Sequence, residues 1–302
     1  MVEVRQTDGM QTRLGTNTLW VLTVLVAWAP TRALAGDPLA YVRSSSQLDR
    51  ATNPAGYHPL NLLDEDPATI WCEGSEGMGE KEEIRFFFKT KQRIDRVVVN
   101  PALSGGRLIQ ELRLTDGTNT VRVRVGENNV EKTLDRALNG TTITVVIDTV
   151  GAANKGSSLN ADVACIADLL LYQGKKLFGG KATPEKLRYD AVRDKVLGRW
   201  AGEPFGAPEK FITFALDGTW EWSYTPLLAG KKERFMGEYR FRGDRLLMRR
   251  GETGRWADMR FKYKRVEVDP TEPGAPKGNY DLISLNEALE EGVQGEYNNA
   301  EF

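Results

Sequence analysis

The side chains best suited to catalysis or ligand binding lie between Tyr57 and Gly74, in the run YHPLNLLDEDPATIWCEG. This run contains His58, the one histidine of the chain. A single histidine excludes most Ser-His-Asp hydrolases, histidine-based zinc sites and histidine acid–base chemistry. Neighbouring carboxylates such as Glu82 and Glu83 point to opposite faces of a strand and cannot act together on one bond. We therefore expect a protein that binds rather than one that catalyses.

The same run could supply a carbohydrate site, which needs an aromatic face and a few polar groups that orient hydroxyls. Trp71 has an alternative place in the core, because it ends an apolar run. The three glycines that follow it precede no Gly-Lys-Ser/Thr and lie in no βαβ pattern, so they do not predict a phosphate site. The glycan-binding candidates are Tyr57, His58, Trp71 and Glu73, with Arg50 and Glu76 as charged neighbours.

The N-terminus has the pattern of a signal peptide over residues 1–35. An uncharged apolar run, Leu19 to Ala29, follows Arg13 and ends near the small residues Ala33 and Ala35. The run is shorter than the ~18 to 20 residues of a membrane-spanning helix, and no later stretch is long and apolar enough to span. We expect an exported protein, periplasmic or secreted, with no transmembrane segment after signal removal.

Composition narrows the function of the remaining residues. Without residues 1–35, the chain has 38 basic and 40 acidic side chains, a net charge of -2, which argues against dedicated nucleic-acid binding. Its two cysteines, Cys72 and Cys165, are an even count in an oxidising compartment, and this predicts a disulfide. The alternative is two buried free thiols.

Residues 36–175 predict an antiparallel β-sandwich, because short β-like runs follow one another without helices between them. In TVRVRV, the valines from Val121 to Val125 face one way and Arg122 and Arg124 the other. Asp116-Gly117 and Asn139-Gly140 are typical of turns.

After a helical linker over residues 176–196, with Thr183 as N-cap, a second β pattern covers residues 197–268. Its hairpin turns and alternating aromatics favour a small meander or barrel. The motif Gly198-x-Trp200, with DGT and GEYRFRGDRLLM, resembles compact lipocalin-like domains of exported bacterial proteins. Residues 269–302 predict an acidic tail with a short helix, capped by Ser284 and Glu287.

Two motifs of the first domain resemble a known family. The run from Asn61 to Trp71 resembles the early loop of discoidin-like, galactose-binding-like carbohydrate-binding jelly rolls. The segments WCEGSEGMGEKEEIRFFF and GSSLNADVACIADLLLY resemble the glycan-binding or translocation domain of secreted bacterial NAD glycohydrolase toxins. The resemblance covers residues 40–172 and implies a jelly-roll fold and glycan binding. The toxin's catalytic domain has no counterpart in this sequence.

The resemblance also implies a structural calcium, which prefers carboxylate, hydroxyl and carbonyl oxygens. The positions that it assigns to the ion are Asp64, Asp66, Thr69 and Asp168. Two departures are Glu65, where the discoidin-like pattern has glycine, and Asp168, where the family has a longer glutamate. The alternative is that Asp64 and Asp66 only shape a turn.

The strongest charge pattern lies near the C-terminus. Residues 231–265 carry a net charge of +8, and residues 266–302 carry -8. The cations alternate with aromatics, so we expect them on an outer sheet face: Arg240, Arg242, Arg260, Lys262 and Lys264. This basic patch could bind an anionic partner, or the acidic tail could neutralise it.

Together these patterns predict an exported all-β protein without catalytic activity, which recognises glycans or cell-surface components through its jelly roll. The alternatives are an envelope scaffold that contacts another protein and a hydrolase with its site in the C-terminal barrel. A scaffold would need a contiguous exposed apolar patch, and a hydrolase a concave cluster of carboxylates.

Overall fold

The computed structural model describes residues 37–102, 106–153, 159, 162–179, 190–202, 209–226, 231–243, 245–266, 280–286, 293 and 295–298. The predicted signal peptide and the predicted N-cap Thr183 lie outside these residues. Within them, the chain has no helix of the length and apolar character needed to cross a membrane. Residues Leu34–Phe302 form one compact unit that contains a β-sandwich and a β-barrel.

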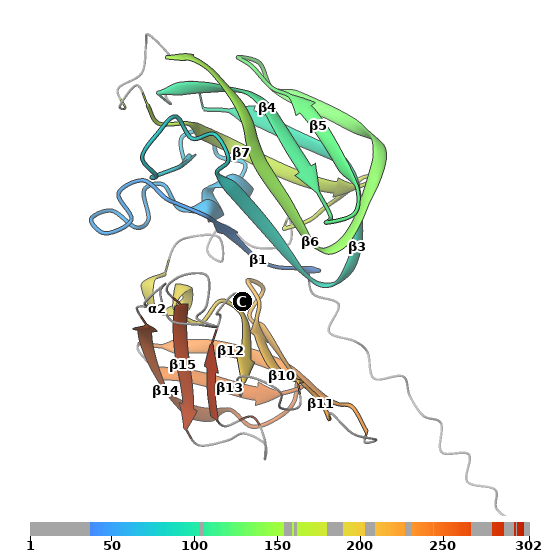
Figure 1. Cartoon of the computed structure of the whole chain (residues 1–302). Coiled ribbons are helices and arrows are strands. Elements are labelled where there is room, and N and C mark those ends of the chain that lie inside the picture. Colours follow the sequence, from blue (N-terminus) through green and yellow to red (C-terminus); the bar gives the residue numbers. More distant parts are fainter. Residues whose placement is uncertain are drawn as a thin grey trace, which may run out of the picture. The chain divides into compact units, whose positions relative to one another are not determined.

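The sandwich confirms the all-β jelly roll predicted for the N-terminal half (Figure 1). Its hydrogen-bonded strand order is β2-β7-β3-β6-β4-β5, with β1 paired to β3 and β8 paired to β7. The strands are β1 Leu39–Ser44, β2 Trp71–Cys72, β3 Glu83–Pro101, β4 Arg107–Thr115, β5 Thr120–Arg124, β6 Val130–Ala153, β7 Cys165–Gln173 and β8 Lys176–Leu177.

Two strands of the sandwich, β3 with 19 residues and β6 with 24, are much longer than the others. The first half of β3 pairs with β1 and its second half with β7, and both halves pair with β6 through register shifts. The predicted turn at Asn139-Gly140 is therefore wrong, since both residues lie inside β6 and pair with β3. A Cβ on Gly140 would lie 2.7 Å from the carbonyl oxygen of Thr142. Gly140 thus allows a close backbone approach inside a strand rather than a chain reversal.

The predicted alternation along β5 is confirmed. Val121 and Val123 are buried in the core, whereas Arg122 and Arg124 are exposed. Successive side chains of a strand point to opposite faces, so Val121 and Val123, two residues apart, share the face that packs on the core.

The C-terminal half forms a closed barrel of eight antiparallel strands in the order β10-β11-β12-β13-β14-β15-β16-β9. This confirms the predicted meander, while the lipocalin-like resemblance stays a prediction. Bulky side chains that are at most 5% exposed are part of its core: Trp200, Phe214, Trp220, Trp222, Tyr239 and Tyr297. The strands are β9 Gly198–Gly202, β10 Glu209–Phe214, β11 Thr219–Thr225, β12 Glu233–Arg242, β13 Arg245–Arg250, β14 Ala257–Val266, β15 Tyr280–Asn286 and β16 Gly295–Asn298.

The acidic segment does not form the predicted capped helix at Ser284. Ser284 lies inside β15, with Ile283 and Leu285 buried on either side of it. Strands β15 and β16 complete the ring between β14 and β9. A short helix is marginal in water, whereas pairing with β14 buries two large apolar side chains and satisfies the backbone. The tertiary contacts therefore override the local capping pattern.

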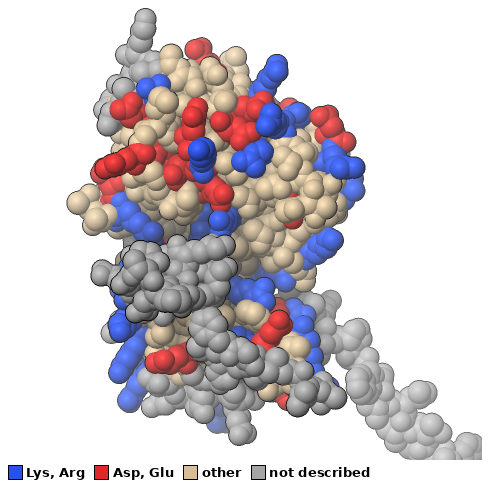
Figure 2. Space-filling model, in the orientation of Figure 1, with Lys and Arg blue, Asp and Glu red and all other residues tan. Residues whose placement is uncertain are grey.

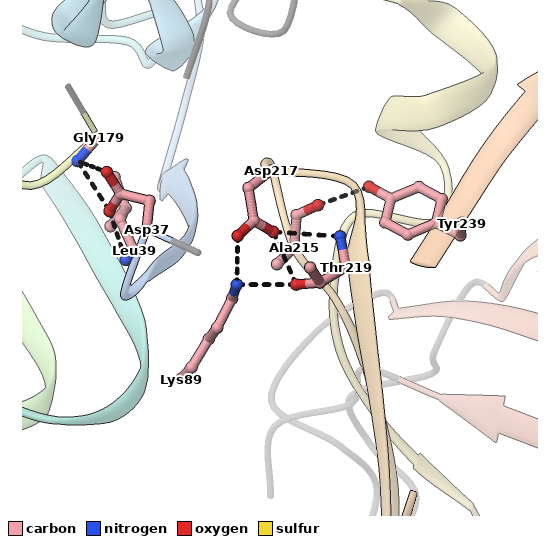
Figure 3. Close-up of polar contacts among 8 residues, drawn as sticks. All are labelled: Asp37, Leu39, Lys89, Gly179, Ala215, Asp217, Thr219 and Tyr239. Carbon is pink, nitrogen blue, oxygen red and sulfur yellow. Dashed lines mark hydrogen bonds and ion pairs between the residues drawn. The ribbon is translucent and has the colours of Figure 1, made fainter. Parts of the chain in front are cut away.

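The linker retains one described helix, α2 Ala191–Asp194, whose N-cap Asp190 accepts hydrogen bonds from the backbone N–H groups of Val192 and Arg193. Polar contacts then join the sandwich to the barrel (Figure 3). Lys89 of β3 contacts Asp217 and Thr219, and the N–H of Leu216 donates to the carbonyl oxygen of Ala40 at 2.6 Å.

Candidate functional site

A cavity of about 560 Å³ lies between strands β1 and β3 of the sandwich, helix α2 of the linker, and strands β14 and β15 of the barrel. This volume is typical of small-ligand sites. Five of the side chains that line it are cations, Arg43, Arg50, Arg85, Lys195 and Arg265, and two are anions, Asp194 and Asp281. We take this cavity as the candidate functional site.

Two residue pairs on neighbouring strands contribute to its wall. In the antiparallel register of β1 and β3, Tyr41 lies opposite Phe87 and Arg43 lies opposite Arg85. The rings of Tyr41 and Phe87 stack with centroids 4.3 Å apart and an angle of 15° between their planes. Directly opposite residues share a face of the sheet, so an aromatic pair and an arginine pair lie in adjacent rows.

The barrel helps to position Arg43. Its Nη2 donates to the carbonyl oxygen of Leu197 at 3.3 Å. The next residue, Gly198, has φ 124°, and a Cβ on it would lie 2.8 Å from that same nitrogen. Glycine is required there for both the backbone conformation and the room for the guanidinium. The glycine of the Gly198-x-Trp200 motif therefore helps to build the cavity.

The barrel side of the cavity contains a second polar cluster. The Tyr263 hydroxyl donates to Asp281 Oδ1 at 2.7 Å, and Arg265 Nη1 lies 3.2 Å from the same oxygen. Burial of the phenol and its hydrogen bond to the carboxylate raise the pKa of Tyr263 to about 12. Tyr263 therefore stays neutral at physiological pH. Lys195 Nζ lies 5.7 Å from the centre of its ring.

His58 and Asp194 join the cavity wall to the end of α2. His58 Nδ1 accepts from the N–H of Leu60, so the proton is on Nε2, which lies 3.1 Å from Asp194 Oδ1. Burial raises the pKa of Asp194, but the hydrogen bond from His58 Nε2 and the positive charges of Arg50 and Arg43 outweigh burial and lower it. Asp194 is thus an ionised carboxylate with a partner. His58 is 6% exposed and contributes to the wall rather than offering an open ring face.

The other residues predicted for glycan binding do not form an open aromatic face. Trp71 and Glu73 are both 0% exposed, in agreement with the core alternative for Trp71. Glu73 accepts hydrogen bonds from the N–H groups of Ser75 and Ala164, and its burial raises its pKa. Tyr57 is half-buried against the small cluster around the cysteines. In the described structure, an exposed tryptophan platform at Trp71 is excluded because the ring has no accessible surface.

Arg43 and Arg85 were not among the residues predicted for the site. A signal was present, since Arg43 lies two residues after an aromatic in YVR and Arg85 two before one in RFF, both at strand spacing. Spacing alone does not say which strands are neighbours, so the opposition of the two arginines could not be foreseen.

The disulfide prediction is confirmed. Cys72 of β2 and Cys165 of β7 are bonded and lie opposite each other in the strand register, 93 residues apart in the sequence. The early loop is therefore tied to the last long strand of the sandwich.

The predicted calcium ligands form two groups. Asp64 accepts from the Thr69 hydroxyl at 2.7 Å and from the N–H of Asp66, while Asp66 accepts from the N–H of Ala68. These bonds are those of a turn. Asp168 lies on β7, apart from this turn in the sequence, but the charges of Asp64 and Glu65 contribute to raising its pKa.

The fit of these residues to calcium is partial. Asp168 is 1% exposed; its Oδ2 accepts from Asn100 Nδ2 at 2.6 Å, and its Oδ1 is buried without a hydrogen-bond partner in the described structure. Burial, followed by the charges of Asp64 and Glu65, raises the pKa of Asp168. The described residues contain no group of three or more His, Cys, Asp or Glu side chains placed to hold a metal. Calcium would thus rely on Asp168 Oδ1 together with backbone or solvent oxygens, and its binding stays a prediction.

The five residues of the predicted basic patch are exposed on β12 and β14, as their alternation with aromatics predicted. On β12 and β13, Arg242 lies opposite Arg245, and the guanidinium groups of Arg240 and Arg249 lie 4.2 and 4.8 Å from the ring centre of Trp256. Acidic side chains neutralise part of this surface, since Arg245 pairs with Asp258 and Arg249 with Glu238. Figure 2 shows lysine, arginine, aspartate and glutamate interspersed over the visible face of the sandwich, so the surface there is of mixed sign.

Residues 35–106 match the family model of the NAD glycohydrolase translocation F5/8 type C domain. This confirms the discoidin-like resemblance, and the matched residues include both pairs of the cavity wall, on β1 and β3. No curated protein matches the chain.

Among solved structures, the chain is similar to the family 32 carbohydrate-binding module of Clostridium perfringens NanJ in complex with galactose. That likeness has 19% identity and a TM-score of 0.31, and covers 44% of this chain and 93% of the module. A chitosan-binding module from Paenibacillus sp. IK-5 has 16% identity and a TM-score of 0.32, over 44% of this chain and 96% of the module.

An arabinofuranosyltransferase from Mycobacteria has 19% identity and a TM-score of 0.37, over 46% of this chain and 11% of the enzyme. The match thus spans about a tenth of that enzyme's length. At these identities and TM-scores, the likenesses say nothing of this chain's ligand.

Proposed function

We propose that the protein is an exported, non-catalytic binding protein that recognises a glycan in the cavity between the sandwich and the barrel. One observation carries the proposal: the stacked Tyr41–Phe87 pair lies beside the Arg43–Arg85 pair in the wall of a cavity of about 560 Å³. Sugar rings present C–H faces that pack on aromatics and hydroxyls that accept hydrogen bonds from fixed donors. Phe87, which is half-buried, and the two guanidinium groups offer both kinds of contact.

The carboxylates of the cavity favour binding over catalysis. Hydrolysis of a glycosidic bond needs one carboxyl group that donates a proton and another that acts as base or nucleophile. Asp194 is ionised and bonded to His58, and Asp281 accepts from Tyr263 and Arg265. Neither is poised as a proton donor, so orientation of a ligand is the chemistry that this arrangement supports.

Three observations support export. The leader-like run before Gly36 has the pattern of a signal peptide, and the Cys72–Cys165 bond is of the kind that forms in oxidising compartments. Residues 35–106 match a domain described as a translocation domain of NAD glycohydrolases, a kind of protein for which export is typical. Fractionation of the native host, with the protein expected outside the cytoplasm, tests this part of the proposal.

A glycan array with the chain from Gly36 to Phe302 tests the binding proposal. The whole chain is needed because residues of the barrel line the cavity. We expect binding to a defined subset of glycans, reduced by Phe87→Ala, which removes the aromatic wall without adding charge. The matched control is Phe235→Ala, because Phe235 is a partly buried barrel residue that does not line the cavity. The absence of binding to any glycan, together with capture of an envelope protein in a pull-down, would overturn the proposal in favour of the scaffold alternative.

A further inference from the structure

Two arginines that lie directly opposite each other on β1 and β3, Arg43 and Arg85, line the cavity. We propose that it binds an acidic saccharide, with a carboxylate or sulfate group of the sugar held between Arg43 and Arg85. This inference rests on the proposed glycan binding and names the chemical class of the ligand.

The register of β1 and β3 supplies the first argument. Arg43 and Arg85 form a cross-strand pair on one face of the sheet, and both line the cavity. Like charges directly opposite each other destabilise a sheet. An oxyanion between the two guanidinium groups would convert this repulsion into two charge-assisted hydrogen-bonding contacts, which are among the strongest that side chains make.

Both arginines have partners within the protein. Arg85 bonds to Glu83 through Nε and Nη2, at 2.9 and 2.7 Å, but this ion pair is about one-third exposed on both sides and is therefore weak. Arg43 donates to the neutral carbonyl group of Leu197. An incoming anion would compete with the exposed Arg85–Glu83 ion pair and leave the Arg43 contact with the barrel in place.

Neighbouring cations extend the positive potential. Arg50 and Lys195 line the same cavity, have exposed side chains and lack a carboxylate partner among the described residues. The two acidic groups of the cavity, Asp194 and Asp281, offset part of this charge, but five cations against two anions leave an excess of positive charge in the lining. A cavity lined by an excess of one sign concentrates ions of the opposite sign.

The aromatic row explains why the anion should belong to a sugar. Phe87 is the residue two positions after Arg85, so a saccharide whose acidic group lies between the arginines can place its ring along the Tyr41–Phe87 row. A free inorganic anion would use only the arginines. The two kinds of ligand thus differ in their dependence on Phe87.

Calorimetry with the full chain tests the inference. The probes are a glucuronate-containing disaccharide, a sulfated disaccharide, the neutral parent disaccharide and sodium sulfate. Arg85→Gln is the main variant because it removes one partner of the repulsive pair and keeps the Arg43 contact with the barrel. Arg50→Gln is the second variant, since substitutions of exposed side chains change stability by less than about 0.5 kcal/mol. Arg124→Gln on β5 is the control, an exposed arginine that does not line the cavity.

We expect the acidic disaccharides to bind at least about 10-fold more tightly than the neutral one, with Arg85→Gln removing this preference. Arg50→Gln should weaken acidic ligands several-fold, and Arg124→Gln should not change binding. The melting temperature of Arg85→Gln without ligand should equal or exceed that of the wild type, because a like-charge contact is removed. A structural role of Arg85 would instead lower it.

Three outcomes would overturn one or both proposals, and they are distinguishable. Equal binding of neutral and acidic sugars, unchanged in Arg85→Gln, would overturn the acidic-ligand inference and leave glycan binding standing. Binding of sulfate alone, unchanged in Phe87→Ala, would show an anion site and overturn glycan recognition. Absence of binding for all four probes, with an array negative for every glycan, would overturn both.

Discussion

Lys89 Nζ lies 2.6 Å from Asp217 Oδ2 and 2.7 Å from Thr219 Oγ1, so strand β3 of the sandwich and the turn between β10 and β11 of the barrel share one polar contact (Figure 3). Asp217 also accepts from the N–H and the hydroxyl of Thr219. Asp217 therefore stabilises its own turn and joins the barrel to the sandwich.

Lys89→Met should lower the free energy of unfolding by about 1 to 3 kcal/mol, because it removes the ion pair between Lys89 and the nearly buried Asp217. Urea denaturation measures this loss. Lys91→Met, at an exposed position of the same strand, is the control and should stay within about 0.5 kcal/mol of the wild type. Equal stability of the two variants would mean that the contact adds nothing to the fold.

Replacing Cys72 and Cys165 together by alanine should lower the stability of the sandwich by about 4 to 5 kcal/mol on the chain-entropy model, given the sequence separation of 93 residues. Thermal unfolding with and without reductant measures the effect. The reductant should destabilise the wild type and have no further effect on the double variant. A wild type that is insensitive to reductant, with the bond shown to be broken, would contradict this prediction.

Asp116 should make stability depend on pH at the acidic end. Burial raises its pKa, but hydrogen bonds from the N–H groups of Asn119, Asn139 and Thr118 and the Asn119 side chain outweigh burial and lower the pKa from 3.8 to about 2. The folded state thus favours the carboxylate, and its stabilising effect is complete above pH ~4 and lost as pH falls from about 4 to about 2. Denaturation across this range should show a smaller slope for Asp116→Asn than for the wild type. Asp135→Asn, at an exposed position, should keep the wild-type slope.

A chain that ends at Asp269 should lose the barrel. Strands β15 and β16 join β14 to β9, and Ile283, Leu285 and Tyr297 are buried at 1% exposure or less. Near-ultraviolet circular dichroism of the barrel tryptophans should therefore collapse in the truncated chain. The idea that an acidic tail covers the basic patch predicts a folded chain with stronger heparin retention, and a preserved tryptophan spectrum would favour that idea.

Calcium binding can be tested at Asp168, whose Oδ1 is buried without a hydrogen-bond partner in the described structure. If the ion binds there, calorimetry should detect heat with calcium, and calcium should raise the melting temperature of the wild type but not of Asp168→Asn. Asp66→Asn distinguishes a role of Asp66 in the turn from a role as calcium ligand. The asparagine oxygen can still accept from the N–H of Ala68, but the negative charge is lost. The absence of heat and of any thermal shift would leave Asp64 and Asp66 as turn residues alone.

Much of the fold could be predicted because it follows from local patterns. The alternation around Val123 depends on the two-residue period of a strand, and Asp116-Gly117 forms the predicted turn because Gly117 adopts φ 88°. Asn139-Gly140 has the same turn chemistry, yet it lies within a continuous strand because β3 pairs with it on one side. Ser284 lies in a strand rather than at the predicted helix cap for the same reason, since pairing with β14 outweighs the capping pattern.

The site was less accessible to prediction. His58 was chosen for its chemistry and does line the cavity, whereas Trp71 and Glu73 lie in the interior. Arg43 and Arg85 were not predicted, because strand spacing alone does not say which strands are neighbours.

The sequence by itself determined the all-β class, the strand alternation and the availability of one disulfide, because these follow from side-chain period, turn chemistry and the number of cysteines. Only the tertiary structure decided which side chains meet. A period of two assigns Arg43 and Arg85 each to a face of its strand, but the pairing register places them opposite each other beside Tyr41 and Phe87. The barrel, about 110 residues further along the chain than Arg85, then closes the cavity around them, and contacts between such distant segments are not encoded in any local run.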